Sequence, residues 1–453
     1  MAFVLFLILF ITEIGFAIFE LGQDRAKSEW TVNRTVANVA QFIIYLVMIL
    51  LPGIDFSFRF KGLFLILIIR IVVAGILALI NRKNEVIKKK AAIVFSAIFS
   101  VIIILVSMVP AFVFTDYQGR PLTGEYAVAQ SEAILIDNSR LETFEKDGSF
   151  REVPVHFYYP ENYTVKDLPL VIFSHGAFGY YQSNTSTYME LASNGYFVVS
   201  LDHPYHSFYT KDSTGKTITV DPEFIQSAMD VGNNPDAHYS EEEIYEITSG
   251  WMQLRMDDMN FVVDTLKEAT SGNYGDSWHF DKSSEKEIKE MIALIDTTKI
   301  GLMGHSLGGA TAVTVGRRED IGAVIDLDGT MLGEELGVEN GMPVINDEPY
   351  TTPLLCVTNE SHHMEAAEAG KVSYSYANNV ILNNAAEGYE TYVAGSEHMD
   401  FTDLPLFSPF LAGMLGKGSV DSEYCIDTTN ALVLEFFNCY LKGEGTFSLQ
   451  ESY

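Results

Sequence analysis

The sequence is poor in cysteine and in basic residues. Its 453 residues include three cysteines, Cys356, Cys425 and Cys439, and 29 Lys and Arg against 60 Asp and Glu. So few cysteines, in an odd number, argue against a disulfide framework. Buried free thiols are the simpler expectation, and a Cys425–Cys439 pair is the alternative. The net charge of −31 excludes a general nucleic-acid binder, and 48% hydrophobic residues exclude a disordered chain.

Charge is distributed unevenly along the chain. Residues 1–115 hold 11 Lys and Arg against 6 Asp and Glu, whereas residues 116–453 hold 18 against 54. The first block is apolar and resembles a membrane segment. The second block is long enough for one large globular domain of roughly 200–300 residues with insertions.

Four apolar stretches lie in the first block, at residues 1–19, 36–54, 60–80 and 91–114. Each is close to the roughly 20 residues that cross a bilayer as a helix, so they predict an α-helical transmembrane bundle. The start lacks the basic region of a cleaved signal peptide. Glu13 and Arg70 fall inside predicted spans, where a charge is costly unless it is paired. A Glu13–Arg70 pair is one hypothesis, and snorkelling of Glu13 towards the membrane surface is the other.

Basic residues in the connecting loops predict the orientation of this bundle. The loop 81–90 contains Arg82, Lys83, Lys88, Lys89 and Lys90, so it is expected in the cytoplasm. The protein is then a multi-pass cell-membrane protein whose N-terminus and whose residues after 114 lie on the extracytoplasmic side. The second span is the weakest; without it, the N-terminus moves inside and the globular domain stays outside.

The second block predicts an α/β fold preceded by a linker at 116–124. Residues 125–453 alternate strand-like and helix-like runs, and several strands are continuous apolar runs typical of a buried parallel sheet. Strands are expected at 133–136, 153–159, 168–173, 196–201, 299–303, 323–327, 353–357 and 390–393. Helices are expected at 185–193, 242–269, 285–294, 307–317 and 428–441. Residues 206–298 form an insertion that is a candidate cap.

The clearest motif is Gly304-His305-Ser306-Leu307-Gly308, which matches G-x-S-x-G. It follows the apolar strand KIGLM and opens a helix-compatible run, which is the context of a nucleophile elbow. Gly304 and Gly308 permit the tight turn that projects Ser306 above the sheet. Ser306 is therefore the predicted nucleophile; the alternative is a structural glycine-rich turn with a surface serine.

A serine hydroxyl needs a base, and the base should follow the last strand. His398 lies directly after the strand-like run YETYV. His362 and His363 come too early in the chain, and their stretch ESHHMEAAEAG lacks the ligand spacing of a metal site. His398 is therefore the predicted base, and neither a metal nor an organic cofactor is expected.

An acid must orient the base, and an oxyanion needs hydrogen-bond donors. Asp328 directly follows the strand AVIDL and is favoured over Asp326, inside that strand, and Glu360, after the next one. The backbone N–H of Leu307 is one predicted donor. The loop His175-Gly176-Ala177 should supply the other from Ala177, with His175 holding the loop in place rather than acting as a base.

At this point the sequence resembles the plasma-type platelet-activating factor acetylhydrolase family of α/β-hydrolases, also called group VII phospholipases A2. The matching blocks lie between residues 168 and 404: VIFSHGAFG, NGYFVVSLDHPYHS, KIGLMGHSLGGATAV, GAVIDLDGTM, PLLCVTNE and GSEHMDFTDL. The resemblance implies an α/β-hydrolase fold, an acid at Asp328 and a second oxyanion donor at Ala177. It also implies calcium-independent hydrolysis of short or oxidised sn-2 acyl chains of phospholipids.

The sequence departs from that family pattern in three places. The secreted eukaryotic members lack the N-terminal spans, Gly329-Thr330 replaces an aromatic residue after the acid, and Leu307 replaces an aromatic residue after the nucleophile. The last two departures concern the acyl-chain preference.

The functional expectation is a membrane-embedded serine ester hydrolase that acts on a lipid or small ester and has no obligatory protein partner. The strong acidity favours a zwitterionic or neutral substrate. One alternative is a general carboxylesterase, lipase or polyester hydrolase of the same superfamily. Another is a non-catalytic, membrane-tethered binding module.

Overall fold

The computed structural model describes residues 1–232, 239–280, 283–372 and 376–453. The chain forms two compact units. One contains Met1–Gln118 and Leu406–Leu411, and the other contains Gly119–Pro405 and Ala412–Tyr453. Between α5 (Val109–Val113) and β1 (Val128–Leu141), a stretch that is described throughout, the chain forms neither helix nor strand. The linker predicted at 116–124 lies in this stretch.

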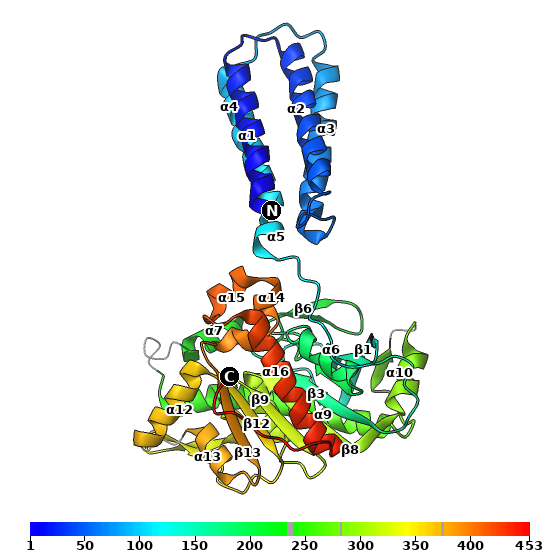
Figure 1. Cartoon of the computed structure of the whole chain (residues 1–453), viewed down its shortest axis with the longest axis vertical. Helices are drawn as coiled ribbons and strands as arrows, with labels where there is room; N and C mark the ends of the chain where they lie inside the picture. The colour runs from blue at the N-terminus through cyan, green and yellow to red at the C-terminus, as the bar shows by residue number, and fades with distance from the viewer. Residues whose placement is uncertain (233–238, 281–282, 373–375) are drawn as a thin grey trace. The chain divides into compact units, whose positions relative to one another are not determined.

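The N-terminal unit is built from four long helices, α1 (Ala2–Leu21), α2 (Lys27–Met48), α3 (Phe58–Ile80) and α4 (Lys90–Ser107). Helix α1 packs beside α4, and α2 packs beside α3 (Figure 1). Among the described residues, α1, α3 and α4 are the three helices that are long and apolar enough to cross a membrane. The predicted bundle of apolar helices is therefore present.

Helix α2 differs from the span predicted at 36–54, since it begins at Lys27 and ends at Met48. The added first turns are polar, so the helix does not reach the apolarity of the other three. In a soluble amphipathic helix the apolar face is buried and the polar face is exposed, and α2 shows the reverse. Arg34, Asn38 and Gln41 are buried, whereas Val36 and Ile43 are more than half exposed. An apolar exterior around a polar interior is the pattern of a helix surrounded by lipid.

The buried face of α2 meets Glu13 of α1, which is itself fully buried. Arg70 Nη2 lies 2.8 Å from Glu13 Oε2, which confirms the hypothesis of a Glu13–Arg70 pair. Arg34 Nη1 lies 2.5 Å from Glu13 Oε1, and Gln41 Nε2 donates to Glu13 Oε2 at 3.2 Å. The prediction placed Arg34 in a cytoplasmic loop with Arg25 and Lys27, because the predicted span began after it; in the structure, α2 begins at Lys27 and Arg34 is buried within it.

The second unit contains a nine-stranded sheet within the described residues, in the order β13-β12-β9-β8-β3-β4-β2-β1-β7. Strands β13 (Gly388–Val393), β12 (Leu354–Asn359), β9 (Ala323–Leu327), β8 (Ile295–His305), β3 (Leu168–Ser174) and β4 (Phe197–Leu201) run parallel. Strands β2 (Phe150–Pro160), β1 (Val128–Leu141) and β7 (Trp278–Phe280) continue it in antiparallel fashion.

Helices cover both faces of this sheet. Successive residues of a strand point to opposite sides, and every residue of β3 is buried, so both faces carry apolar side chains that need a covering layer. In β3, Leu170 and Ile172 pack with α9 (Glu241–Ala269), α10 (Glu285–Ile292), α11 (Leu307–Val315) and α13 (Ala377–Asn384). Val171 and Phe173 face the other way and pack with α6 (Thr185–Ser193) and α16 (Ser422–Phe437). A mostly parallel sheet between two helical layers is the predicted α/β-hydrolase fold (Figure 1).

The insertion expected at 206–298 is only partly separate from this core. It contains β5 (Tyr209–Lys211), β6 (Thr217–Thr219), α7 (Pro222–Gly232), α9, β7 and α10. Met259, Val262, Val263 and Leu266 of α9 lie in the main core, because their spacing forms one apolar stripe on the helix. Strand β7 extends the sheet, so much of the insertion packs against the sheet itself.

The three cysteines are free, and Cys356 and Cys425 are buried. The alternative of a Cys425–Cys439 disulfide is therefore wrong. Cys425 lies in α16, and Cys439 follows that helix in the turn Asn438–Lys442.

Candidate active site

Ser306 occupies a sharp turn between β8 and α11. Its backbone has φ 57° and ψ −127°, a conformation that L-residues seldom adopt and that stores strain. Its N–H donates to the Leu327 carbonyl at 2.9 Å, which ties the turn to the neighbouring strand β9. The strand, turn and helix predicted around the G-x-S-x-G motif are all present.

The glycines of the motif let the backbone segments approach closely. A Cβ on Gly308 would lie 1.9 Å from the Ser174 carbonyl oxygen, and a Cβ on Gly304 would lie 2.2 Å from the carbonyl carbon of Gly308. Both positions exclude any side chain. The elbow therefore touches the end of β3, where the chain enters the loop of His175 and Gly176.

His398 lies in a short 3₁₀ helix, His398–Phe401, soon after β13. Its Nδ1 lies 2.6 Å from Asp328 Oδ2. The imidazole of His305, the residue before Ser306, lies 4.5 Å from that of His398 between ring centres. His305 Nε2 also hydrogen bonds to the His398 carbonyl at 3.0 Å. The His398 side chain is 41% exposed, so it sits beside the elbow and remains open to solvent.

Asp328 directly follows β9, and its φ of 55° turns the chain away from the strand. Its carboxylate is buried and accepts from the Asn359 N–H at 2.8 Å and from Asn359 Nδ2 at 2.7 Å. Burial alone would raise the pKa of Asp328. Hydrogen bonds from His362 and His398 outweigh burial and bring that pKa well below its usual range. Asp328 is therefore an ionised carboxylate held against His398.

The two competing acids lie elsewhere. Burial raises the pKa of Asp326 well above its usual value, and its Oδ1 accepts from the Gly329 N–H at 2.9 Å. Glu360 Oε2 accepts from the Gly395 N–H at 2.7 Å. Asp326 braces the turn after β9, whereas Glu360 braces the turn after β13.

The loop after β3 lies against the elbow. A Cβ on Gly176 would lie 3.0 Å from Ser306 Cβ and 2.9 Å from His305 Nδ1. His175 is fully buried, with Nδ1 2.7 Å from the Gly176 carbonyl oxygen and Nε2 2.8 Å from Ser207 Oγ. Burial lowers the pKa of His175 well below its usual value. A neutral, doubly hydrogen-bonded imidazole braces this loop.

Arg255 of α9 also holds the loop, and the sequence reasoning missed it. The guanidinium is fully buried, and it donates from Nη1 to the His175 carbonyl at 2.6 Å and from Nη2 to the Gly176 carbonyl at 3.3 Å. Burial lowers the pKa of Arg255 to about 9, and the charge of Asp258 acts in the opposite direction. The signal was available, because Arg255 shares the stripe of α9 that carries the buried Met259 and Val262.

Asp258, on the same stripe, anchors a second layer beneath the loop. It accepts from His203 Nδ1 at 2.9 Å and from Arg151 Nη2 at 2.7 Å. His203 Nε2 hydrogen bonds to Ser174 Oγ at 2.9 Å, at the end of β3. Arg255 and Asp258 thus fix the start of the loop through two separate sets of contacts.

An apolar cluster flanks both predicted oxyanion donors. Phe224 of α7, Met252 of α9 and Leu307 are buried in it, and Ala177 packs against it. Trp251 and Leu332 complete its edge. The insertion therefore brings apolar side chains to the turn of Ser306 and Leu307.

His362 and His363 contact two different carboxylates. Among the described residues, no group of three or more His, Cys, Asp or Glu is placed to hold a metal ion. His362 Nδ1 lies 3.1 Å from Asp328 Oδ1, and His363 Nδ1 lies 3.1 Å from Glu390 Oε1.

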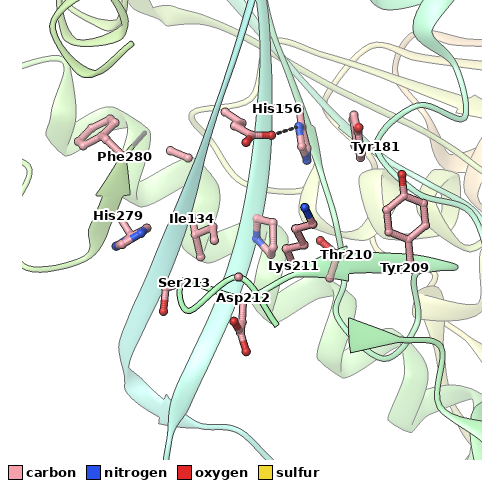
Figure 2. Close-up of a pocket in the computed structure, with 14 residues that line it drawn as sticks. Ile134, His156, Tyr181, Tyr209, Thr210, Lys211, Asp212, Ser213, His279 and Phe280 are labelled. Carbon is pink, nitrogen blue, oxygen red and sulfur yellow. Dashed lines mark ion pairs between the residues drawn. The ribbon is translucent and has the colours of Figure 1, made fainter. Parts of the chain in front are cut away.

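A separate cavity of about 340 Å³ opens at the far edge of the sheet (Figure 2). It is lined by parts of β1 and β2, the β5–β6 hairpin and β7. His156 lies within it. Its ring stacks on that of Tyr181 with 3.5 Å between the ring centres, and its Nδ1 lies 3.5 Å from Glu132 Oε2. Strands β3, β4 and β2 stand between β8 and β1, so this cavity is distinct from the Ser306 site.

Comparison with known proteins places this site in a family. A family model described as platelet-activating factor acetylhydrolase, isoform II, matches residues 151–451. The chain is 23% identical over 308 residues to a platelet-activating factor acetylhydrolase of Bos taurus, covering 64% of this chain and 61% of that protein. It is 26% identical over 285 residues to the enzyme of that name from Cavia porcellus, covering 61% and 58%.

The chain thus spans about three fifths of the length of these relatives. Among solved structures, a ferulic acid esterase from Streptomyces cinnamoneus is similar, with a TM-score of 0.49 and 20% identity over 72% of this chain and 93% of that one. The family model covers well over half of the sequence, and it spans Ser306, Asp328, His398 and the loop after β3. The chain belongs to the platelet-activating factor acetylhydrolase, isoform II, family.

Proposed function

We propose that this chain is a membrane-anchored serine ester hydrolase that removes short or oxidised sn-2 acyl chains from phospholipids. Ser306 is the nucleophile, His398 the general base and acid, and Asp328 the carboxylate that orients His398. The observation that carries the proposal is the 2.6 Å contact between His398 and the buried Asp328, beside the strained turn of Ser306. Membership of the family supports the reaction type.

The reaction begins with proton transfer. His398 Nε2 takes the hydroxyl proton of Ser306 while Ser306 Oγ forms a bond to the ester carbonyl carbon. His398 becomes an imidazolium, and the ionised Asp328 at its Nδ1 stabilises that charge. His398 then gives the proton to the leaving alcohol oxygen as the ester C–O bond breaks. Water attacks the acyl-serine with the same base, releases the carboxylic acid and restores the Ser306 hydroxyl.

The negative charge on the carbonyl oxygen needs preorganised donors. The N–H groups of Leu307 and Ala177 flank the elbow, and each such donor contributes roughly 3–4 kcal/mol to transition-state stabilisation. Leu307 is the first residue of α11, so the positive end of that helix adds to the same effect. His175, Gly176, Gly304 and Gly308 position these donors and do not react.

The substrate class follows from apolarity and charge. The apolar cluster of Phe224 and Met252 beside Leu307 suits an acyl chain. Residues 116–453 carry 54 acidic against 18 basic residues, so they repel anionic lipid headgroups. A zwitterionic phospholipid or a neutral ester therefore fits best.

The N-terminal unit anchors the protein in the cell membrane. Helices α1, α3 and α4 have the length and apolarity to span it, and the inverted faces of α2 support a fourth span. With the basic loop 81–90 in the cytoplasm, the catalytic unit lies on the extracytoplasmic side. A cysteine-specific, membrane-impermeant reagent should label a cysteine introduced at exposed Thr217 in intact cells, in a Cys439→Ser background that removes the one partly exposed native thiol. Labelling only after lysis would contradict this orientation.

Serine reactivity is the direct test of the proposal. The full chain should react with a fluorophosphonate probe and turn over p-nitrophenyl acetate, and Ser306→Ala should abolish both. Ser249→Ala is the matched control, since that hydroxyl donates to the Glu246 carbonyl on α9 at 3.2 Å. Activity retained in Ser306→Ala would reject the assignment. Absence of labelling in the wild type would instead support a non-catalytic binding module.

Substrate comparison separates the phospholipid assignment from a general carboxylesterase or polyester hydrolase. Rates on short-chain phosphatidylcholine should exceed those on tributyrin and on a soluble aryl ester. Lipid analysis of membranes incubated with wild type and with Ser306→Ala then identifies the lipid that is consumed. A preference for tributyrin or the aryl ester would favour the broader esterase.

A further inference from the structure

A second histidine contacts the carboxylate that holds His398. His362 lies in the first turn of α12 (Glu360–Val372), and its Nδ1 lies 3.1 Å from Asp328 Oδ1. His398 Nδ1 lies 2.6 Å from the other oxygen, Oδ2. Two imidazoles therefore share one carboxylate, each on its own oxygen.

The remaining contacts of Asp328 do not titrate. Asn359 donates its backbone N–H to Oδ1 and its side-chain amide to Oδ2, so four donors surround the buried carboxylate. Neither Asn359 group changes charge with pH. Any pH-dependent change in the support that Asp328 gives to His398 must therefore come from the imidazoles.

The surroundings of His362 allow it to gain or lose a proton in place. Its backbone N–H donates to Asn359 Oδ1 at 2.7 Å, which fixes the start of the helix. Its Nε2 meets the Tyr376 hydroxyl. Neutral His362 donates Nδ1–H to Asp328 and accepts from Tyr376; protonated His362 donates from both nitrogens, with the Tyr376 oxygen as acceptor.

Three other ionisable groups besides Asp328 act on the imidazole of His362. The charge of Asp326, from β9, acts to raise the pKa of His362, and burial raises the pKa of Asp326 itself. Burial likewise raises the pKa of Tyr376 above its usual value, and Glu365 faces His362 from its own helix. Burial lowers the pKa of His362, but the hydrogen bond and charge of Asp328 outweigh burial and raise that pKa above its usual value.

We propose that His362 is a positioning residue that regulates the site with pH, through the carboxylate it shares with His398. The inference rests on the proposed Ser306 mechanism. Neutral His362 holds Asp328 in place while the carboxylate keeps its full charge for His398. Protonated His362 neutralises much of that charge, so Asp328 no longer stabilises the imidazolium that His398 forms when it takes the Ser306 proton, and the form with protonated His362 is inactive. The site then loses activity on the acidic side through two coupled protonations rather than one.

The test is the pH profile of kcat/KM on p-nitrophenyl acetate, measured on the full chain in detergent. On the acidic limb, the wild type should fall with a slope approaching two. His362→Asn keeps a donor near the Nδ1 position but cannot titrate, so its slope should be one. At pH 8, its kcat/KM should stay within roughly tenfold of wild type, because one hydrogen bond is retained.

His363→Asn is the matched control, because His363 contacts Glu390 and stacks on Tyr392 at 4.5 Å instead of touching Asp328. Its acidic limb should keep the wild-type slope. Tyr376→Phe keeps His362 but removes the hydroxyl at Nε2, so it should shift the higher of the two apparent pKa values. This second variant decides the question if His362→Asn does not fold.

The outcomes separate the two proposals. Identical slopes in wild type and His362→Asn, with an unshifted Tyr376→Phe profile, would overturn the role of His362 alone, provided that Ser306→Ala is inactive. Activity in Ser306→Ala would overturn the proposed function, because the profile would then report another site.

Discussion

Asp326 and Asp328 lie two residues apart, and both are buried, yet their pKa values are shifted in opposite directions. Asp328 has four hydrogen-bond donors, whereas Asp326 Oδ2 has none within the described structure. A buried carboxylate stays charged only where donors replace the water that it has lost. At the residue scale, the number of donors therefore decides which carboxyl can hold His398.

Arg255 is the residue whose loss should most affect the loop of Gly176 and Ala177, for which we propose an oxyanion donor. It donates to the Gly176 carbonyl, and the N–H on the opposite side of that peptide belongs to Ala177. Arg255→Met should lower kcat/KM on p-nitrophenyl acetate by roughly 10- to 100-fold, because the peptide loses the contact that aims this donor. Arg255→Lys should lose less, since it keeps the charge but not the fork of donors.

Arg318→Met is the control for Arg255→Met, because Arg318 pairs near the surface with Asp264 and Asp320. Its kcat/KM should remain at the wild-type value. The thermal unfolding temperature of each variant shows whether a loss of activity comes from a misplaced Ala177 N–H or from a destabilised fold. A folded Arg255→Met with full activity would contradict the role given to Arg255.

Sequence reasoning singled out Ser306, Asp328, His398 and the bracing residue His175. It did not predict the contacts that Arg255 makes with the His175 carbonyl and that His362 makes with Asp328. Ser306, Asp328 and His398 are each marked by a short local pattern at the end of a strand. Arg255 and His362 act on those patterns from helices 51 and 56 residues away from Ser306, on opposite sides of it in the chain. No local pattern encodes such contacts, because they exist only once α9 and α12 pack at the sheet edge.

At the scale of elements, most helices and strands of the globular unit follow their sequence patterns. The strand predicted at 323–327 and the helix at 185–193 have those bounds in the structure. Helix α2 is the main departure. Its polar first turns and its buried polar stripe lower its mean apolarity without breaking the helix. Its polar stripe is satisfied by Glu13 of another helix, which the sequence of α2 alone does not contain.

The close approach of α11 to β3 gives a prediction at this scale. Gly308→Ala would place a Cβ 1.9 Å from the Ser174 carbonyl oxygen, so the elbow must shift. Loss of esterase activity and a lower unfolding temperature should follow. Gly250→Ala is the control, since nothing lies within 4 Å of a Cβ there and Gly250 is inside α9. That change should stabilise the protein by roughly 0.5–1 kcal/mol, and a harmless Gly308→Ala would contradict the packing of the elbow.

At the scale of the whole molecule, buried ionisable groups link stability to pH. Asp403 is fully buried and accepts from the Ser186 N–H at 2.8 Å, at the start of α6. Burial raises the pKa of Asp403 to about 6, and the hydrogen bonds of Ser186 offset only part of that rise. The folded state therefore favours the protonated carboxyl. Its contribution to stability is complete below the unfolded pKa near 3.8 and is lost as the pH rises through 6.

Asp403→Asn removes this titration and should flatten the pH dependence. From pH 4 to pH 7, the stability of Asp403→Asn relative to wild type should rise by up to about 3 kcal/mol, as expected for a shift of about two pKa units. Denaturant midpoints of the full chain in detergent, followed by tryptophan fluorescence, measure the difference. Asp276→Asn, at an exposed position, is the control. A constant difference between wild type and Asp403→Asn across this range would contradict the buried, protonated state of Asp403.

The sequence by itself determined the two-part composition of this protein, the alternation of strands and helices, and the motif that places Ser306 at a turn. These features depend on local composition and on side-chain periodicity, which the chain carries in any conformation. Only the tertiary structure decided that His362 shares Asp328 with His398, that Arg255 holds the loop of Gly176, and that Arg34 joins Arg70 at Glu13. Each of these contacts joins residues that lie far apart in the sequence and replaces the water that a buried charge has lost. Only the packing of the folded chain brings such residues together.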